Sequence, residues 1–253
     1  MFDTFDKTST DLDPIFGSAP GFPIVLYFHH VLPNANHYTA LTPESFTRAI
    51  GTITQYLQPV AARNVLLLNG VAALPDHPSV LITIDDGYAD QIEFALPILE
   101  TFGLKAIFFV NTSLLGRRTT GGRQMYMSAE DCRELNRRGH IIAPHGRTHA
   151  DLTQHSVVER TDQIVGSFRE LVLSVGLATD DVIPCFAFPY GRVVEIPRPV
   201  QEACGEMHAF GTVKSPPASW TTKPHAIRRT YLPTGREECW SLMTRKWVQG
   251  WFG

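Results

Sequence analysis

Three short clusters of residues could carry chemistry, and two of them are rich in Asp or His. Asp85 and Asp86 are adjacent and are followed by Gly87, and His145 and His149 lie four residues apart in HGRTH. Adjacent carboxylates after an apolar run are costly unless a cation or hydrogen bonds compensate their charge. Two imidazoles and one carboxylate make a three-ligand metal site with room for water and substrate, which is the arrangement of catalytic zinc.

The third cluster is FAFPYG at residues 186–191, which predicts a strand that ends in a Pro-Tyr-Gly turn. Each cluster also has a simpler interpretation: a solvated Asp-Asp-Gly turn, an HxxxH pair without metal, and a purely structural turn. Their common position favours a functional site, because each one lies where a predicted strand ends. In parallel α/β folds, the loops after the strands converge on one site.

Alternating strand and helix patterns surround these clusters. Apolar runs predict strands at 24–28, 80–84, 106–110, 140–143 and 182–188, with weaker strands at 65–68 and 207–213. Amphipathic patterns predict helices at 43–57, 92–102, 128–138, 156–175 and 237–249. Strand, helix and strand within about 30 residues form a βαβ unit, which implies a parallel sheet. Repetition of this unit over the chain favours an α/β fold of the (β/α) barrel type.

Several helix starts carry capping signals. Thr42 precedes Pro43, which suits the first helical position. Ser128 with Asp131, and the equivalent pair at residues 156 and 159, predict capping boxes. Residues 1–20 are polar and turn-rich, so we expect an N-terminal arm there and a single barrel domain at 21–253.

The composition indicates one large globular domain. The chain has 253 residues, of which 43% are hydrophobic and 19% are charged, and this excludes global disorder. A net charge of -3 gives no bulk attraction to nucleic acid or to an anionic membrane. No apolar stretch approaches the ~18 residues of a spanning helix, and no secretory signal is visible. We therefore expect a cytoplasmic protein without a membrane span, whose four widely spaced cysteines are free thiols.

The clusters also resemble the motifs of a known family. LITIDDGYAD, HGRTHADL and FAFPYG occur in the order of the first three motifs of the polysaccharide deacetylase family, also called the NodB homology domain or carbohydrate esterase 4. The intervening ALPILETFGLKAIFFV is typical of it, and the resemblance covers Gly21 to Arg229. It implies a distorted (β/α) barrel of about seven to eight strands that removes N-acyl groups with a divalent metal. Zinc is the first expectation, and cobalt, nickel or iron also suit the donor set.

The match implies a role for each motif residue. It implies metal ligands at three positions, which are Asp86, His145 and His149. Asp85 corresponds to the catalytic base. Pro189 and Tyr190 match the motif that forms the groove wall, where the backbone N–H of the tyrosine helps to hold the oxyanion.

Two features depart from the family pattern. Ala187 stands where the family usually has an arginine that steadies the base, and Arg229 is our candidate replacement. The usual C-terminal Leu-x-His, which supplies the general acid, is missing. However, IVLYFHHV resembles a branch with YHxV near its start, which includes biofilm polysaccharide deacetylases. In that branch a permuted strand order brings an N-terminal histidine into the place of the acid. This makes His29 the candidate acid, with His30 as a second choice whose alternative role is structural.

These implications predict a metal-dependent N-deacetylase that hydrolyses an N-acetyl or N-acyl group from an amino-sugar-containing substrate, giving acetate and a free amine. The expected partner is a small molecule or an oligosaccharide, and nucleic acid is not expected. Two other classes remain open. One is a metal-dependent hydrolase of a non-sugar amide, such as a cyclic ureide or imide. The other is a non-catalytic carbohydrate-binding relative.

Overall fold

A parallel sheet forms the centre of the protein. The computed structural model describes residues 21–66, 73–212, 220 and 226–250. The strands of the sheet lie in the order β1-β5-β6-β7, and β4 (Gln58–Pro59) pairs with the start of β5. These four strands are β1 (Ile24–Phe28), β5 (Ser79–Ile84), β6 (Ala106–Val110) and β7 (Ile141–Pro144). Neighbouring strands are parallel throughout, as the βαβ patterns predicted.

Two further parallel strands extend this arrangement around the molecule. They are β8 (Cys185–Ala187) and β9 (His208–Phe210). Residues 226–231 lie between β9 and β1, since isolated parallel bridges join Phe210 to Ile227 and Leu26 to Thr230. β7 and β8 contact each other but belong to separate sheets. The strands therefore follow one another in a ring, with no ladder between β7 and β8 and only isolated bridges on either side of residues 226–231.

Alternate residues of the central strands face two different apolar cores. One core gathers side chains on the inner side of the ring, among them Val25, Leu81, Ile107, Phe109, Ile141 and Phe210. The other lies under the outer helices and contains the intervening residues, among them Leu26, Ile82, Phe108 and Ile142. Because both faces are buried, these strands are continuous apolar runs in the sequence.

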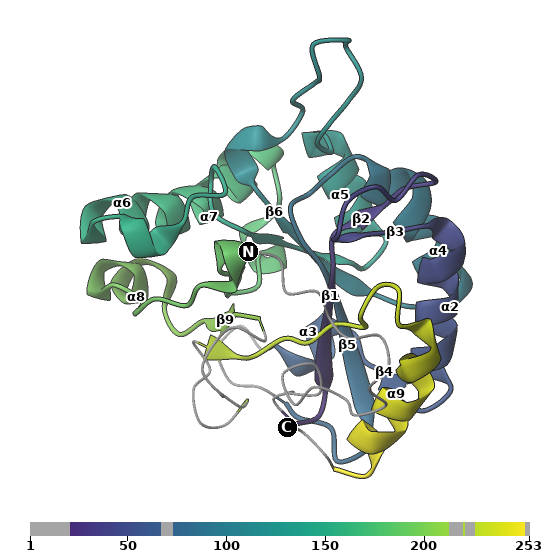
Figure 1. Ribbon diagram of the computed structural model, residues 1–253. Coiled ribbons are helices and arrows are strands. Elements are labelled where there is room, and N and C mark those ends of the chain that lie inside the picture. The colour runs from purple at the N-terminus through teal and green to yellow at the C-terminus, as the bar shows by residue number, and fades with distance from the viewer. Residues whose placement is uncertain (1–20, 67–72, 213–219, 221–225, 251–253) are drawn as a thin grey trace.

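Helices cover the outside of the sheet on two sides. One group packs on the outer core and consists of α2 (Pro43–Thr54), α4 (Leu96–Thr101), α5 (Ala129–Arg137) and α9 (Trp240–Val248). A second group packs over β8 and β9 and consists of α6 (Val157–Thr161), α7 (Ser167–Glu170) and α8 (Arg198–Cys204). Figure 1 shows the two groups on opposite sides of the sheet. Trp240 and Trp247 are buried within α9 and belong to the outer core.

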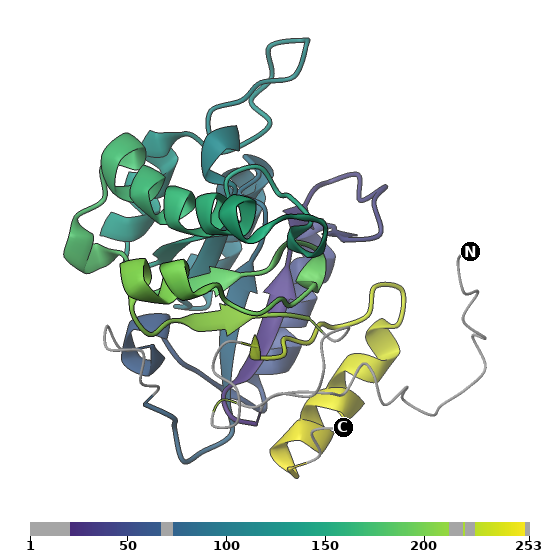
Figure 2. The ribbon, with the colours of Figure 1, turned by 90° about the vertical axis from the view of Figure 1, so that its left-hand side faces the viewer.

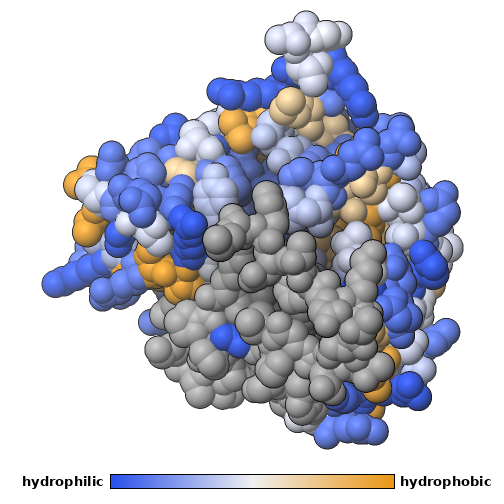
Figure 3. Space-filling view, in the orientation of Figure 1, coloured by the Kyte–Doolittle hydropathy of each residue, from blue (hydrophilic) through white to orange (hydrophobic). Residues whose placement is uncertain are grey.

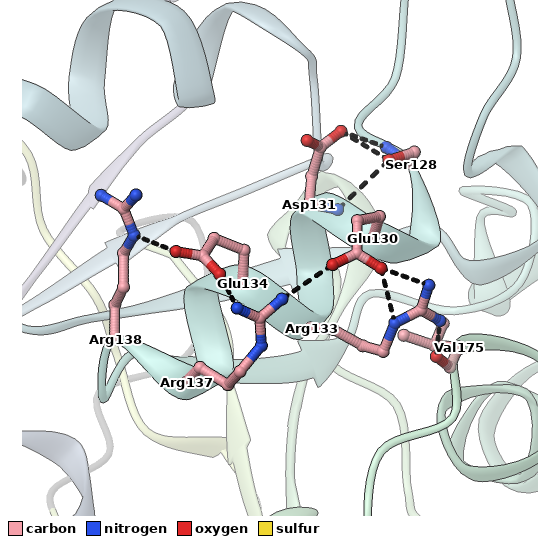
Figure 4. Close-up of polar contacts among 8 residues, drawn as sticks. All are labelled: Ser128, Glu130, Asp131, Arg133, Glu134, Arg137, Arg138 and Val175. Carbon is pink, nitrogen blue, oxygen red and sulfur yellow. Dashed lines mark hydrogen bonds and ion pairs between the residues drawn. The ribbon is translucent and has the colours of Figure 1, made fainter.

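The predicted helix starts are confirmed. The Thr42 hydroxyl accepts a hydrogen bond from the Ser45 N–H at 3.1 Å. Both capping boxes form, and Figure 4 shows the one that joins Ser128 to Asp131. The predicted helix at 156–175 is a continuous helical run that alternates between α and π geometry and ends at Gly176, whose φ is 81°.

The weaker strand predictions needed correction. The prediction of a strand at 65–68 is wrong where the chain is described, because residues Ala62–Val65 form the short helix α3. Ala62 and Val65 are both buried and three residues apart, so this apolar run suits one face of a helical turn. The predicted strands at 182–188 and 207–213 shorten to β8 and β9. A small parallel pair, β2 (His30–Val31) with β3 (Ala40–Leu41), was not predicted.

A hairpin at residues 116–127 projects from the body of the protein between β6 and α5 (Figures 1 and 2). The coloured part of the face in Figure 3 is mostly hydrophilic, with apolar side chains in separate patches. All four cysteines are free, as predicted. Within the described ranges, no helix is both long and apolar enough to cross a bilayer. The predicted arm at residues 1–20 lies outside the described residues.

Candidate active site

The two aspartates follow β5 and point into the same region for different reasons. Thr83 and Asp85 continue the inward alternation of the strand, which would send Asp86 to the opposite face. The backbone breaks this alternation at Asp86 itself, where φ is 78°, and again at Gly87, where φ is 73°. The Asn111 side chain donates a hydrogen bond to the Asp86 carbonyl oxygen at 3.2 Å. Both aspartates are buried, with 2% and 7% of their surface exposed.

Asp85 forms a bidentate ion pair with Arg229. The two arginine Nη atoms lie 2.6 and 2.7 Å from the two carboxylate oxygens. Arg229 is completely buried. It also donates to the Gly211 carbonyl oxygen at 2.9 Å and to the Thr83 hydroxyl at 3.0 Å. Burial acts to raise the pKa of Asp85, but the charge and hydrogen bonds of Arg229 outweigh it and lower that pKa to about 2.

The position of Arg229 follows from the strand order. Its segment, 226–231, lies between β9 and β1, and the Thr230 N–H donates to the Val25 carbonyl oxygen at 2.8 Å. β1 in turn pairs with β5, so the arginine is two positions away from the strand that carries Asp85. Ala187 lies in β8 and is fully buried in the inner core. The guanidinium that contacts Asp85 therefore comes from a different segment than the one that carries the family's motif arginine.

Three side chains converge on a space suited to a metal ion. Asp86 Oδ1 lies 3.2 Å from His149 Nε2 and 3.6 Å from His145 Nε2, and one ligand atom from each residue lies within 4.8 Å of the others. Asp86 Oδ1 is buried and has no hydrogen-bond partner in the described part of the chain. A buried carboxylate oxygen without a partner is costly, and a cation between the three side chains would remove that cost. The residues therefore fit a divalent metal.

The protonation of the histidines also suits a metal. The Ala187 carbonyl oxygen lies 2.7 Å from His145 Nδ1, so this nitrogen must be the donor and Nε2 keeps its lone pair. Burial lowers the pKa of His145 to about 3. Burial also lowers the pKa of His149. Both imidazoles are therefore neutral near pH 7, which is the form that binds metals.

The loop between these histidines is not a helical turn, although histidines four residues apart can also lie on one side of such a turn. It bends at Gly146 and His149, where φ is 83° and 58°. The Gln163 side-chain oxygen holds the loop by accepting hydrogen bonds from the N–H groups of Arg147 at 3.0 Å and Thr148 at 3.2 Å. No local pattern identifies this brace, because Gln163 resembles any polar residue on a surface helix.

The Pro-Tyr-Gly turn forms one side of the site. Pro189 is buried, whereas Tyr190 is 53% exposed and its ring centroid lies 4.5 Å from that of His149. Gly191 has a φ of 64°, and a Cβ there would lie 2.1 Å from the Thr212 hydroxyl oxygen, so no larger residue fits.

Backbone strain gathers at the site. In the part of the chain that the structure describes, three non-glycine residues have positive φ, and they are Asp86, His149 and Tyr190. Such conformations cost about 1–3 kcal/mol each and persist where the surrounding structure enforces them. All three strained residues are among the positions that the motifs singled out.

The two adjacent histidines after β1 have different surroundings. Burial lowers the pKa of His29, while the charges of Asp85 and Asp86 act in the opposite direction. The Gln91 side chain donates to the His29 carbonyl oxygen at 3.1 Å and also to that of Asp85. His30 instead contacts Asp90, with Nδ1 2.9 Å from Oδ1. The charges of both motif aspartates thus act on His29, whereas His30 pairs with Asp90.

Comparisons with known proteins agree with this arrangement. Residues 73–207 match the family model described as polysaccharide deacetylase, which covers just over half of the chain. A protein of Bacillus subtilis (strain 168) that carries the name of a polysaccharide deacetylase, YxkH, is 34% identical over 79 residues. That match spans 31% of this chain and only about a quarter, 26%, of the relative.

Solved structures show the same fold. The deacetylase PplD of Streptococcus pyogenes, in complex with acetate, gives a TM-score of 0.68 at 21% identity and covers 87% of this chain and 96% of its own. IcaB from Ammonifex degensii gives 0.68 at 19% identity, with 89% and 96% covered. The predicted distorted (β/α) barrel is therefore confirmed as the fold class. With the family model matched over more than half of its length, the chain belongs to the polysaccharide deacetylase family.

Proposed function

We propose that this protein is a metal-dependent deacetylase that hydrolyses an N-acetyl or N-acyl group from an amino-sugar-containing substrate. One observation carries the proposal: a candidate base and a set of candidate metal ligands lie next to each other. A carboxylate held by a buried arginine, Asp85, directly precedes Asp86, which lies against His145 and His149. A base and a set of metal ligands are the two components that amide hydrolysis by a metal enzyme requires.

Asp86, His145 and His149 would hold the metal. When bound, a divalent ion supplies Lewis-acid polarisation of the acyl carbonyl and lowers the pKa of a water. Two imidazoles and one carboxylate suit zinc first, and cobalt, nickel or iron as well. The tautomer of His145, fixed by the Ala187 carbonyl oxygen, presents Nε2 to this position.

Asp85 acts as the base. Because Arg229 keeps its pKa low, the carboxylate is ionised and free of a proton before the reaction begins. The bidentate pair also fixes its orientation, so the oxygens need no rearrangement to accept a proton from the attacking water. In this role Arg229 is a positioning residue that replaces the arginine missing at Ala187.

Pro189 and Tyr190 bind the acyl group. Pro189 is buried and sets the start of the turn, while the positive φ of Tyr190 orients its peptide group. The backbone N–H of Tyr190 donates to the oxyanion as it forms. Loss of one such donor typically costs about 2.7–4 kcal/mol of transition-state stabilisation.

His29 delivers a proton to the departing nitrogen, because an amine leaves poorly as an anion. Its lowered pKa makes the neutral imidazole the resting form at pH 7. The proton that Asp85 takes from water is the one that must reach the leaving group. That proton passes from Asp85 to His29 and then to the nitrogen, and the negative charge of Asp86 favours the protonated form of His29 in between.

The domain that carries this activity is proposed to extend over residues 21–253. The expected substrate is an acetylated amino sugar, alone or within an oligosaccharide. The cytoplasmic location stays a prediction from the sequence.

Metal analysis coupled to acetate release tests the proposal. Purified protein should bind about one divalent metal ion per chain through the three-ligand site and should release acetate from N-acetylated sugars. His149→Ala should lose both metal and activity, whereas His77→Ala, a histidine distant from the site, should lose neither. If the protein purified without metal and stayed inactive after addition of zinc, cobalt or nickel, a carbohydrate-binding relative would replace our proposal. Activity on cyclic imides but on no N-acetyl sugar would favour the ureide and imide class.

A further inference from the structure

Glu170, the last residue of α7, joins two loops that lie beside the proposed metal ligands. One of its carboxylate oxygens lies 3.0 Å from Arg147 Nε and 2.8 Å from Arg147 Nη2. The other oxygen accepts hydrogen bonds from the hydroxyl groups of Thr112 and Ser113, the second at 3.1 Å. Arg147 belongs to the loop after β7, which we call the histidine loop (residues 145–149). Thr112 and Ser113 begin the turn after β6, which we call the β6 turn.

The histidine loop carries two of the three proposed ligands. Arg147 lies between His145 and His149 in the chain, so a shift of Arg147 moves the segment that joins them. Asp162 also holds the arginine, because its Oδ2 lies 2.7 Å from Arg147 Nη1. The arginine stem lies so close to the helix that a Cβ at Gly166 would be 2.8 Å from Arg147 Cδ. The side chain between the two histidines is therefore clamped on the helical run that ends α7.

The β6 turn leads to the third proposed ligand. Asn111 directly precedes the turn, and its side chain donates a hydrogen bond to the Asp86 carbonyl oxygen at 3.2 Å. The main chain of the turn also contacts the histidine loop, since the Ser113 N–H donates to the Arg147 carbonyl oxygen at 2.9 Å. The contacts of Glu170 therefore lead, through the β6 turn and through Arg147, to the segments that carry all three ligands.

The histidine loop needs a restraint from outside. His149 has a φ of 58°, and a backbone conformation of this kind persists only where the surrounding structure enforces it. Gln163 restrains the loop itself, because it accepts hydrogen bonds from two N–H groups of the loop and donates to the Thr148 hydroxyl at 3.1 Å. Glu170 acts differently, because its carboxylate contacts the histidine loop and the β6 turn at once. It therefore restrains one loop relative to the other.

Such a restraint matters for metal binding more than for stability. The side chains of Arg147 and Glu170 are 33% and 23% exposed, and an ion pair that water reaches contributes little to the free energy of unfolding. Groups behind the ligands of a metal, in contrast, tune its affinity because they orient those ligands. We propose that Glu170 is a positioning residue that fixes the histidine loop relative to the β6 turn, and thereby the spacing of the three metal ligands. This inference rests on the ligand set of the proposed function.

Zinc affinity tests this role. The dissociation constant of zinc would be measured by competition with a chromogenic chelator, and the urea midpoint would be measured on the same metal-free proteins. Glu170→Ala should bind zinc about ten-fold more weakly than the unmodified protein, which is the lower end of the range for groups behind metal ligands. Its urea midpoint should change little. Glu170→Gln keeps an acceptor for the β6 turn but loses the charge that holds Arg147, so its zinc affinity should lie between the two.

Asp162→Asn is the matched control. It also removes a carboxylate from Arg147, but Asp162 is 58% exposed, and in the described part of the chain no hydrogen bond joins it to the β6 turn. Its zinc affinity should stay near that of the unmodified protein. An equal loss in Asp162→Asn, or an unchanged affinity in Glu170→Ala, would overturn the proposal. If Glu170→Ala fails to fold, Gly166→Ala decides, because alanine favours a helix while its Cβ displaces the Arg147 stem. Weaker zinc binding by that variant supports the proposal, and unchanged binding overturns it.

Hydrogen exchange of the metal-free protein separates this inference from the proposed function. Glu170→Ala should lose amide protection in the histidine loop and the β6 turn and should keep it in β1. If the unmodified protein bound no zinc but the variant lost protection in these two loops, the metal enzyme would be refuted and the positioning of the loops would stand. If zinc bound and acetate was released, but Glu170→Ala kept both its zinc affinity and its protection, the positioning role would fail while the deacetylase proposal stood.

Discussion

Arginine and carboxylate groups pair in two contrasting regions of this protein. At the site, Arg229 and Asp85 form a bidentate pair with 0% and 3% of their side chains exposed. On α5, Arg137 pairs with Glu130 and Glu134, and the exposed fractions of Arg137 and Glu130 are 61% and 62% (Figure 4). The same two functional groups thus form one buried pair and one set of solvent-exposed pairs.

The difference shows where an ion pair has consequences for chemistry. On α5 water solvates each group, so either partner can leave at little cost. In the buried pair each charge depends on the other, and the Thr83 hydroxyl and the Gly211 carbonyl oxygen occupy further donors of the arginine. Only the buried pair therefore holds a carboxylate in one orientation and away from solvent.

The largest effect is expected when the buried pair loses its arginine. Arg229→Met leaves the Asp85 carboxylate buried without compensation, which should lower the free energy of unfolding by about 3–5 kcal/mol. Chemical denaturation followed by circular dichroism would measure it. Arg229→Lys keeps the charge without the fork geometry and should recover part of the stability.

A second substitution distinguishes lost charge compensation from lost packing. Adding Asp85→Asn to Arg229→Met removes the uncompensated charge and should restore much of the stability. A double variant as unstable as Arg229→Met alone would show that the cost came from packing, and the contrast with α5 would then not concern electrostatics.

Acid should reduce the free energy of unfolding that the buried pair provides, by an amount between the effects of the Arg229 and Arg137 substitutions. Folding lowers the pKa of Asp85 from 3.8 to about 2, so the folded state binds fewer protons than the unfolded state between these values. The resulting stabilisation, about 2 kcal/mol, is fully present above about pH 4 and is lost as pH falls through about 2. The stability difference between the unmodified protein and Asp85→Asn, measured by urea unfolding, should shrink over that interval. A difference that grew towards low pH would contradict the direction of the shift.

The smallest effect is expected on α5. Arg137→Gln removes both exposed pairs and should change the free energy of unfolding by less than about 1 kcal/mol, and by less still in 0.5 M salt. The same urea titration measures it. A loss comparable to that of Arg229→Met would remove the distinction between the two regions.

The predictability of the site from sequence differed from residue to residue. Asp85 and His145 face inward by the simple alternation of β5 and β7, so their placement follows from the apolar pattern. Asp86 does not, because its orientation depends on a positive φ that no local pattern specifies. Arg229 was named through the missing arginine at Ala187, but its contact with Asp85 spans 144 residues and depends on the order of the strands.

The fold shows the same difference between features that local patterns predict and features that depend on distant contacts. Long apolar runs and capping boxes predicted the central strands and most helices, because both faces of the strands are buried and the caps act locally. The short segment at Ala62–Val65 and the pairing of β2 with β3 depend on distant neighbours, and periodicity could not predict them.

The central claim is that Asp85 acts as the base beside a separate set of metal ligands. The most direct measurement is acetate release by Asp85→Asn and by the unmodified protein, each loaded with zinc to the same measured occupancy, on the N-acetylglucosamine tetramer. We predict equal metal content and a rate lower by about 10²–10⁴-fold in the variant, which is the range for loss of a general base. A variant with the same metal content and a rate near that of the unmodified protein would contradict the account.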